Sequence, residues 1–129
     1  MINLLLKTNA GGDAADDTLV FSNFTNVIGT NKADVLTGDG KDNQLTGLGG
    51  ADLLMGMDGN DTLLGGNGDD TLIGGAGADR LMGGAGDHNR VSYKDSVQAV
   101  QVNLANTDDP QQGGDAQGDV LSDIQEVQG

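Results

Sequence analysis

The sequence is poor in the residues that usually staple or fill a folded domain. Its 129 residues include no cysteine, no tryptophan, one proline, one tyrosine and two phenylalanines. The absence of cysteine excludes disulfides and thiolate metal sites. Low hydrophobicity and a net charge of −14 approach the composition of a disordered chain, and 23 glycines add backbone entropy. The composition therefore predicts that ion binding and folding are coupled, and that the ion-free chain is largely unstructured.

Positive charge is also scarce. The chain has six lysines and arginines but 20 acidic residues, of which Glu126 is the only glutamate. This balance argues against nucleic acid and against insertion into an anionic membrane. Because helices use glutamate freely, the bias towards aspartate predicts turns and ligand positions, not helices. A chain of 129 residues is expected to form one domain.

A catalytic constellation is missing as well. His88 is the only histidine, and it lies in an irregular stretch where we interpret it as a tolerated turn residue. The sequence contains no G-x-S-x-G, H-E-x-x-H, Walker or EF-hand pattern. Glycine-rich turns can cradle phosphate, but neighbouring aspartates would repel it. We therefore expect no enzymatic activity.

What the sequence does have is a nine-residue repeat that starts at Gly29 and runs to Met82. Its units are GTNKADVLT, GDGKDNQLT, GLGGADLLM, GMDGNDTLL, GGNGDDTLI and GGAGADRLM, followed by a damaged unit, GGAGDHNRV. In the six intact units position 1 is glycine, position 6 is aspartate or once asparagine, and position 8 is leucine. A unit this short cannot bury a hydrophobic face alone, so neighbouring units must stack.

The pattern within each unit predicts a short strand and a tight turn. The leucine at position 8 has neighbours that point the other way, and glycines at positions 1, 2 and 4 permit positive φ and close backbone approach. Two units then make one circuit, with leucines inside and units of the same parity stacked about 4.8 Å apart. We expect an all-β fold, a right-handed parallel β-roll (β-solenoid) with two short-stranded parallel sheets.

This stacking gathers negative charge. The position-6 columns would be Asp34, Asp52 and Asp70 on one side, and Asn43, Asp61 and Asp79 on the other. Carboxylates at strand spacing repel by roughly 1 kcal/mol per pair even in a water-like dielectric, so a cation must lie between them. Lysine and arginine are too few in the intact units. Ca²⁺ fits, because it accepts six to eight oxygens from carboxylates and turn carbonyls in flexible geometry.

The tandem pattern GGxGxDxUx is typical of the RTX (repeats-in-toxin) proteins, and about half of the chain resembles their calcium-binding β-roll. The resemblance implies Ca²⁺ between stacked turns, held by position-6 side chains and by turn carbonyls. Carried over to this sequence, the metal ligands are Asp34, Asp52, Asp61, Asp70 and Asp79, with Asn43, Gly49, Gly59, Gly66, Gly68, Gly75 and Gly77.

Some units depart from this pattern. The first has threonine and lysine where glycine is expected, and the second has aspartate, lysine and asparagine at the Gly, Gly and Asp positions. Sites built on these two should be weaker or absent, although Asp39 or Asp42 could supply a substitute oxygen. The seventh unit has one extra residue near Asp87, His88 and Asn89, so its register stays open.

The segments that flank the repeats match each other. Residues 11–19 (GGDAADDTL) resemble residues 113–121 (GGDAQGDVL), which gives a second period of about 100 residues. We expect one continuous solenoid with an N-terminal linker or capping coil (1–28), a nonapeptide β-roll (29–91) and a C-terminal linker or capping coil (92–129). INLLL, TLVF, FTNVI, AVQVNL and DVLSDIQEV should supply strands. Asp115 and Asp119, in glycine-containing turns, are either extra ligands or solvated loop residues.

Position 9 should face outward. It holds Thr37, Thr46, Met55, Leu64, Ile73 and Met82. These side chains form either a docking surface for a neighbouring domain or a set chosen for ordinary β-propensity. A regular outward threonine ladder, which would favour recognition of ice or polysaccharide, is incomplete.

Together these features predict a calcium-binding module of a large secreted bacterial RTX protein such as an adhesin. The module would fold on Ca²⁺ outside the cell and serve as a structural spacer, with the flanking domains of a longer parent chain as partners. The alternative is the C-terminal accessory β-roll of a secreted protease, lipase or epimerase.

The expected location follows from affinity. Extracellular calcium modules bind at about 10⁻⁴ to 10⁻³ M, so their sites would be empty in a cytosol. Members of the RTX family leave through type I secretion, yet DIQEVQG does not look like the secretion tail and INLLL is too short for a signal peptide. We therefore expect a piece of a longer secreted protein.

Overall fold

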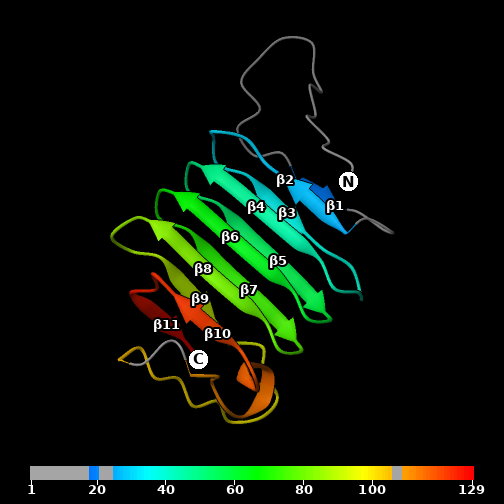
Figure 1. Cartoon of the computed structure of the whole chain (residues 1–129), viewed down its shortest axis with the longest axis vertical. Coiled ribbons are helices and arrows are strands. Elements are labelled where there is room, and N and C mark those ends of the chain that lie inside the picture. Colours follow the sequence, from blue (N-terminus) through cyan, green and yellow to red (C-terminus); the bar gives the residue numbers. More distant parts are fainter. Residues whose placement is uncertain (1–17, 21–24, 106–108) are drawn as a thin grey trace.

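The chain winds as a coil whose strands alternate between two parallel sheets (Figure 1). The computed structural model describes residues 18–20, 25–105 and 109–129. The strands are β1 (Thr18–Val20), β2 (Asn26–Ile28), β3 (Val35–Thr37), β4 (Gln44–Gly49), β5 (Leu53–Asp58), β6 (Thr62–Asn67), β7 (Thr71–Ala76), β8 (Arg80–Ala85), β9 (Arg90–Ser92), β10 (Val120–Ser122) and β11 (Glu126–Gln128). One short 3₁₀ helix, η1 (Gly114–Ala116), precedes β10.

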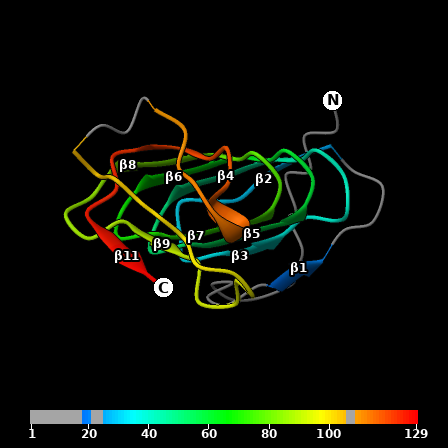
Figure 2. The same ribbon diagram turned by 90° about the horizontal axis from the view of Figure 1, so that it is seen from below.

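The two sheets face each other across a thin core (Figure 2). One has the order β1-β3-β5-β7-β9-β11 and the other β10-β8-β6-β4-β2. Every pairing is parallel, and in the intact repeats Leu36 pairs with Leu54 while Leu45 pairs with Leu63, a step of two nonapeptides. The predicted all-β parallel roll with two units per circuit is confirmed.

The core is two stacked columns of single aliphatic side chains. The leucines at position 8 are 0 % exposed: Leu36, Leu45, Leu54, Leu63, Leu72 and Leu81. Val27, Val91 and Leu121 occupy the same inward register at the ends, paired with Leu45, Leu72 and Leu81. Since strand side chains alternate between faces, position 9 faces outward and is half-buried in every intact unit, as expected.

The turns depend on positive φ at position 2. Gly66, Gly75 and Gly84 adopt φ of 117°, 104° and 89° there. Leu48 and Met57 occupy the same position in earlier units with φ of 84° and 89°, a region in which a side chain costs on the order of 1–3 kcal/mol. The stacking thus imposes one backbone shape on units of different sequence.

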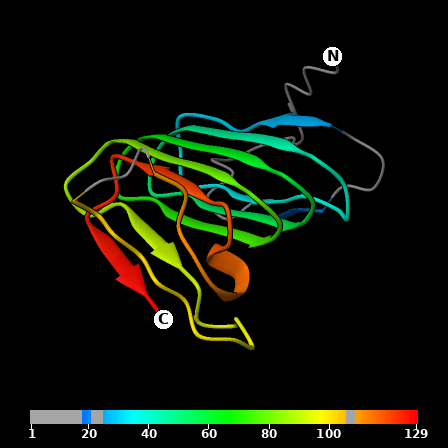
Figure 3. The ribbon, with the colours of Figure 1, turned by 60° about the horizontal axis from the view of Figure 1, so that its bottom comes forward.

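The flanking segments add coils at both ends. β1 and β2 form where TLVF and FTNVI predicted strands, and β10 and β11 form where DVLSDIQEV did. INLLL lies outside the described residues. The strand predicted for AVQVNL is wrong: between β9 and β10 the chain leaves the coil (Figure 3), and the one β pairing in the described part of this stretch is an isolated antiparallel bridge, Gln101 to Gln112. Val100 and Val102 pack against the core cluster instead of entering a sheet.

Candidate metal centre

Position-6 side chains are buried in the turns that lead into each strand. Asp34, Asn43, Asp52, Asp61, Asp70 and Asp79 are all at most 5 % exposed. Aspartate is rarely buried without a partner, because an ionised carboxylate loses its hydration there. Five buried aspartates and one buried asparagine at one position of the repeat therefore mark the turns as a functional feature.

A hydrogen-bond ladder lines these side chains up. The Oδ1 of Asp52 accepts from the backbone N–H of Asp34 at 2.8 Å, and the Oδ1 of Asp70 accepts from that of Asp52 at 2.8 Å. On the other side, Asp61 accepts from Asn43 at 2.7 Å and Asp79 from Asp61 at 2.8 Å. The structure therefore brings the position-6 residues into the two columns that the repeat predicted.

The second oxygen of four of these carboxylates has no hydrogen-bond partner. These buried atoms are the Oδ2 of Asp52, Asp61, Asp70 and Asp79. Leaving such an oxygen unsatisfied costs about 1–3 kcal/mol, and more when the group is ionised. Each carboxylate thus requires a proton or a cation.

Each of three of these free oxygens, together with a backbone carbonyl oxygen, approaches the α-carbon side of one position-1 glycine, where a Cβ would meet both. A Cβ placed on Gly47 would collide with the Oδ2 of Asp52 and would lie 2.6 Å from the carbonyl oxygen of Gly65. The same arrangement joins Asp61 to Gly74 around Gly56, and Asp70 to Gly83 around Gly65. Carboxylate and carbonyl oxygens are the donor set that Ca²⁺ prefers, so these residues fit the ion.

Side chains alone do not complete a metal shell here. Among the described residues, no three histidine, cysteine, aspartate or glutamate side chains gather as a metal-binding group. A cation bound here would therefore need backbone oxygens for much of its coordination. This explains why the turns are glycine-rich, since glycine leaves carbonyl groups unshielded.

Electrostatics point to the same need for a counter-charge. Burial, with a smaller contribution from neighbouring aspartates, raises the pKa of Asp52 and of Asp61 to about 6, against the backbone hydrogen bond that lowers it. Burial also raises the pKa of Asp70, and raises that of Asp79 to about 7, where Asp119 adds to the shift. Without a cation, the folded turns therefore favour the protonated form of these aspartates to a higher pH than the ordinary pKa of 3.8 would allow.

The first two units satisfy their position-6 groups internally. The Oδ2 of Asp34 accepts from the backbone N–H and hydroxyl of Thr30 at 2.6 and 3.0 Å. The amide of Asn43 accepts from the N–H of Asp39 at 2.7 Å and donates to its carboxylate at 3.3 Å. Weaker sites in these units stay a prediction, and these contacts support it.

The six predicted glycine ligands lie at the closely packed start of each turn. Gly49 is the last residue of β4, Gly66 and Gly75 are the last but one of β6 and β7, and Gly59, Gly68 and Gly77 follow β5, β6 and β7. Their role as ligands stays a prediction. The carbonyl oxygen that approaches the same glycine as the free carboxylate oxygen belongs to position 1, as in Gly65. Sequence reasoning missed this group, although glycine at position 1 of every unit was a signal for it.

Two residues outside the intact units extend the columns. Asn89 accepts from the N–H of Asp70 at 3.0 Å, which sets the register of the damaged unit with one extra residue. Asp119 accepts from the N–H of Asp79 at 2.8 Å and is fully buried, so it is not a solvated loop residue. The signal for Asp119 was Leu121 two residues later, the spacing of positions 6 and 8.

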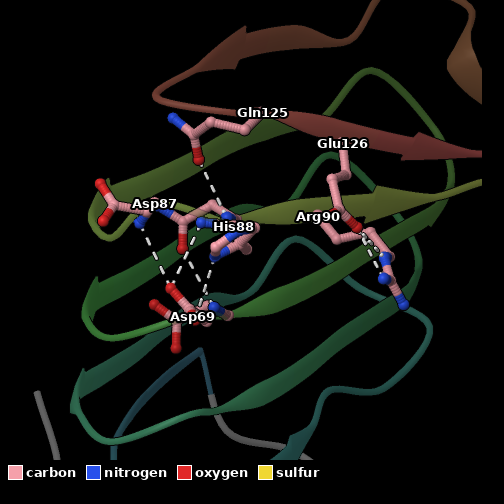
Figure 4. Close-up of polar contacts among 8 residues, drawn as sticks. Asp69, Asp87, His88, Arg90, Gln125 and Glu126 are labelled. Carbon is pink, nitrogen blue, oxygen red and sulfur yellow. Dashed lines mark hydrogen bonds and ion pairs between the residues drawn. The ribbon is translucent and has the colours of Figure 1, made fainter.

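The damaged turn has its own polar contacts (Figure 4). Asp69 accepts from the backbone N–H groups of Asp87 and His88 at 3.2 and 3.3 Å, and the His88 ring lies 3.5 Å from Asp69 with its side chain 67 % exposed. Arg90 pairs with Glu126 at 2.6 Å across β9 and β11. His88 thus lies outside the aspartate columns, in keeping with its interpretation as a turn residue.

A glycine substitution tests the packing of these turns. Gly56→Ala places a methyl group against the Oδ2 of Asp61 and the carbonyl of Gly74, so we expect a loss of at least about 2 kcal/mol in unfolding free energy. Gly40→Ala is the matched control, because a Cβ there meets nothing within 4 Å, and its change should stay within about 0.5 kcal/mol. Urea unfolding in Ca²⁺ measures both; equal effects would contradict the packing argument.

Comparison with known proteins adds a family match. The model of the RTX calcium-binding nonapeptide repeat (4 copies) matches residues 28–63 and 55–87. No curated protein and no solved structure matches the chain. In the described residues, no helix is both long and apolar enough to cross a membrane.

Proposed function

We propose that this chain, which carries RTX calcium-binding nonapeptide repeats over residues 28–87, is a secreted module that Ca²⁺ folds into a rigid spacer. The observation that carries the proposal is the set of four buried aspartate oxygens without a hydrogen-bond partner. Because these aspartates lie in a ladder that joins successive coils, a cation bound to them would hold those coils together. An RTX roll of this kind is a structural calcium-binding domain.

Two kinds of residue would bind the ion, aspartates through their side chains and glycines through their backbone. Asp52, Asp61, Asp70 and Asp79 would supply carboxylate oxygens, and position-1 glycines such as Gly65 would supply carbonyl oxygens. When bound, Ca²⁺ supplies positive charge that offsets the repulsion within each column. Because each carboxylate also accepts a hydrogen bond from the preceding coil, fixing it fixes the neighbouring turn.

Charge-neutral substitutions test these ligands. Asp61→Asn and Asp70→Asn keep the Oδ1 acceptor of the ladder but remove the carboxylate charge, so each should raise the Ca²⁺ midpoint at least about tenfold and weaken cooperativity. Calorimetric Ca²⁺ titration measures this. The control is Asp95→Asn, which removes the same charge from a side chain that is 80 % exposed. Unchanged midpoints in both column variants would refute these ligands.

The secreted location is supported by the repeats themselves, which are typical of secreted proteins. The same Ca²⁺ titration tests it. We expect a midpoint of about 10⁻⁴ to 10⁻³ M, the range of extracellular modules. A midpoint below about 10⁻⁶ M would contradict this, because the roll would then fold inside the cell before export.

The spacer role is supported by the match between the flanks. β1 and β10 fall on the matching ends, 18–19 and 120–121, of the two flanking segments, and β2 and β11 are the next strands after them. β1 carries β3 on its edge and β2 carries β4, whereas β10 and β11 are the last strands of their sheets in the described chain. A following run of nonapeptides would therefore find the same pair of edges and continue the solenoid.

Small-angle scattering of one and of two tandem copies in Ca²⁺ tests this continuity. A continuous solenoid should give a single rod whose maximum dimension about doubles with the second copy, because stacked coils add length at a constant strand spacing. Two beads joined by a flexible linker would contradict the spacer role. The chain without Ca²⁺ serves as the unfolded reference.

A further inference from the structure

We propose that Asp79 and Asp119 form a further calcium site that fastens the C-terminal segment to the end of the roll, next to the phenol of Tyr93. The inference rests on the proposed Ca²⁺-binding function but concerns a residue that the repeats do not contain. Asp119 lies beyond residues 28–87, which match the family model.

The chain path brings these two carboxylates together. Asp119 follows Asp79 by 40 residues, and its Oδ1 accepts the Asp79 backbone N–H at 2.8 Å. The contact repeats the ladder of the intact units, in which each position-6 carboxylate accepts from the residue one coil earlier. β10 begins at the next residue and pairs in register with β8 through Val120 and Arg80. Asp119 is thus the next member of the Asp61–Asp79 column.

A buried oxygen in this end turn lacks a partner. The Oδ2 of Asp79 accepts no hydrogen bond, and Asp79 is 2 % exposed. The Oδ2 of Asp119 accepts from the hydroxyl of Tyr93 at 2.8 Å, and both residues are buried. In the described part of the chain, the ion pairs at Arg90 and Lys94 go to Glu126 and Asp95, away from this pair.

A phenol does not neutralise two carboxylates. Tyr93 gives Asp119 a hydrogen bond but no positive charge, so an ionised Asp79–Asp119 pair would hold two negative charges away from water. A hard divalent cation with oxygen ligands removes this imbalance, and Ca²⁺ completes its shell with carbonyl groups or water. Occupation of the site would hold Tyr93 and Asp119, the two ends of that excursion, against the last coil.

Tyr93 also provides a spectroscopic probe of this site. It is the only tyrosine, and the chain has no tryptophan. Tb³⁺ replaces Ca²⁺ at oxygen sites and emits when a nearby tyrosine is excited, with transfer that falls steeply with distance. We expect tyrosine-excited Tb³⁺ emission from the whole chain to rise and saturate as far-UV circular dichroism reports folding. Asp119→Asn should raise the emission midpoint at least about tenfold, and Asp95→Asn should leave it unchanged.

The readouts separate this site from the general function. If Tb³⁺ and Ca²⁺ fold the wild-type chain but tyrosine excitation gives no Tb³⁺ emission, the end site is refuted while the proposed function stands. The same holds if Asp119→Asn folds and emits with the wild-type midpoint. If neither ion folds the chain, both proposals fail. Tyr93→Phe, which should fold with ion yet lose the emission, verifies that the signal comes from Tyr93.

Discussion

Chelation of Ca²⁺ at pH 7 is expected to unfold the roll. The chain carries a net charge of −14, and its repeat core has one leucine per nine residues. An ion at a hundredfold excess over its dissociation constant contributes about 2.7 kcal/mol per site, so four sites contribute about 11 kcal/mol. That is comparable with the whole stability of an ordinary domain, about 5–15 kcal/mol.

The measurement is far-UV circular dichroism and small-angle scattering with Ca²⁺, and after addition of a chelator. We expect the β spectrum to be replaced by that of a disordered chain, and the radius of gyration to increase about twofold. Mg²⁺ in place of Ca²⁺ is the control, and it should not restore the fold, because it demands rigid octahedral geometry and gives up water reluctantly. A β spectrum that persists in excess chelator would overturn the coupling between ion and fold.

Acidification is expected to stabilise the metal-free roll. Burial raises the pKa of Asp52 and Asp61 to about 6 and of Asp79 to about 7, from an ordinary value of 3.8. A group whose pKa is higher in the folded state contributes stability that is fully present below its unfolded pKa. That contribution is lost as pH rises through the folded pKa. The window therefore runs from about pH 4 to pH 7, and a shift of two units corresponds to about 3 kcal/mol per carboxylate.

Urea unfolding in chelator at pH 4, 5, 6 and 7 tests this sign. The midpoint should be highest at pH 4 and fall towards pH 7, where the metal-free chain is unfolded. With Ca²⁺ present the trend should reverse, because protons and Ca²⁺ compete for the same oxygens and binding strengthens as pH rises. Metal-free stability that increases from pH 4 to pH 7 would show that these carboxylates are satisfied by some other group.

The nine-residue spacing of the repeat was enough to predict much of the candidate site. Glycine, aspartate and leucine recur at one period, and a fixed period sets which residues stack once two units make a circuit. Asp52 and Asp70 are therefore neighbours for the same reason that Leu54 and Leu72 are. The expectation for AVQVNL failed because alternation does not say which segment will occupy a sheet edge. The edges of β8 and β9 are taken by β10 and β11, which come later in the chain. In the structure Val100 and Val102 pack on the core from a segment outside the coil.

The sequence by itself determined the coil, its leucine core and its two columns of aspartates, because a repeat carries its register in its period. Only the tertiary structure decided which carboxylates keep a free oxygen. Thr30 satisfies Asp34 in the first unit, whereas Asp79 keeps its Oδ2 free. It also decided that Asp119 joins the Asp79 column across 40 residues. No period links those two positions, so their contact depends on the path of the chain between them.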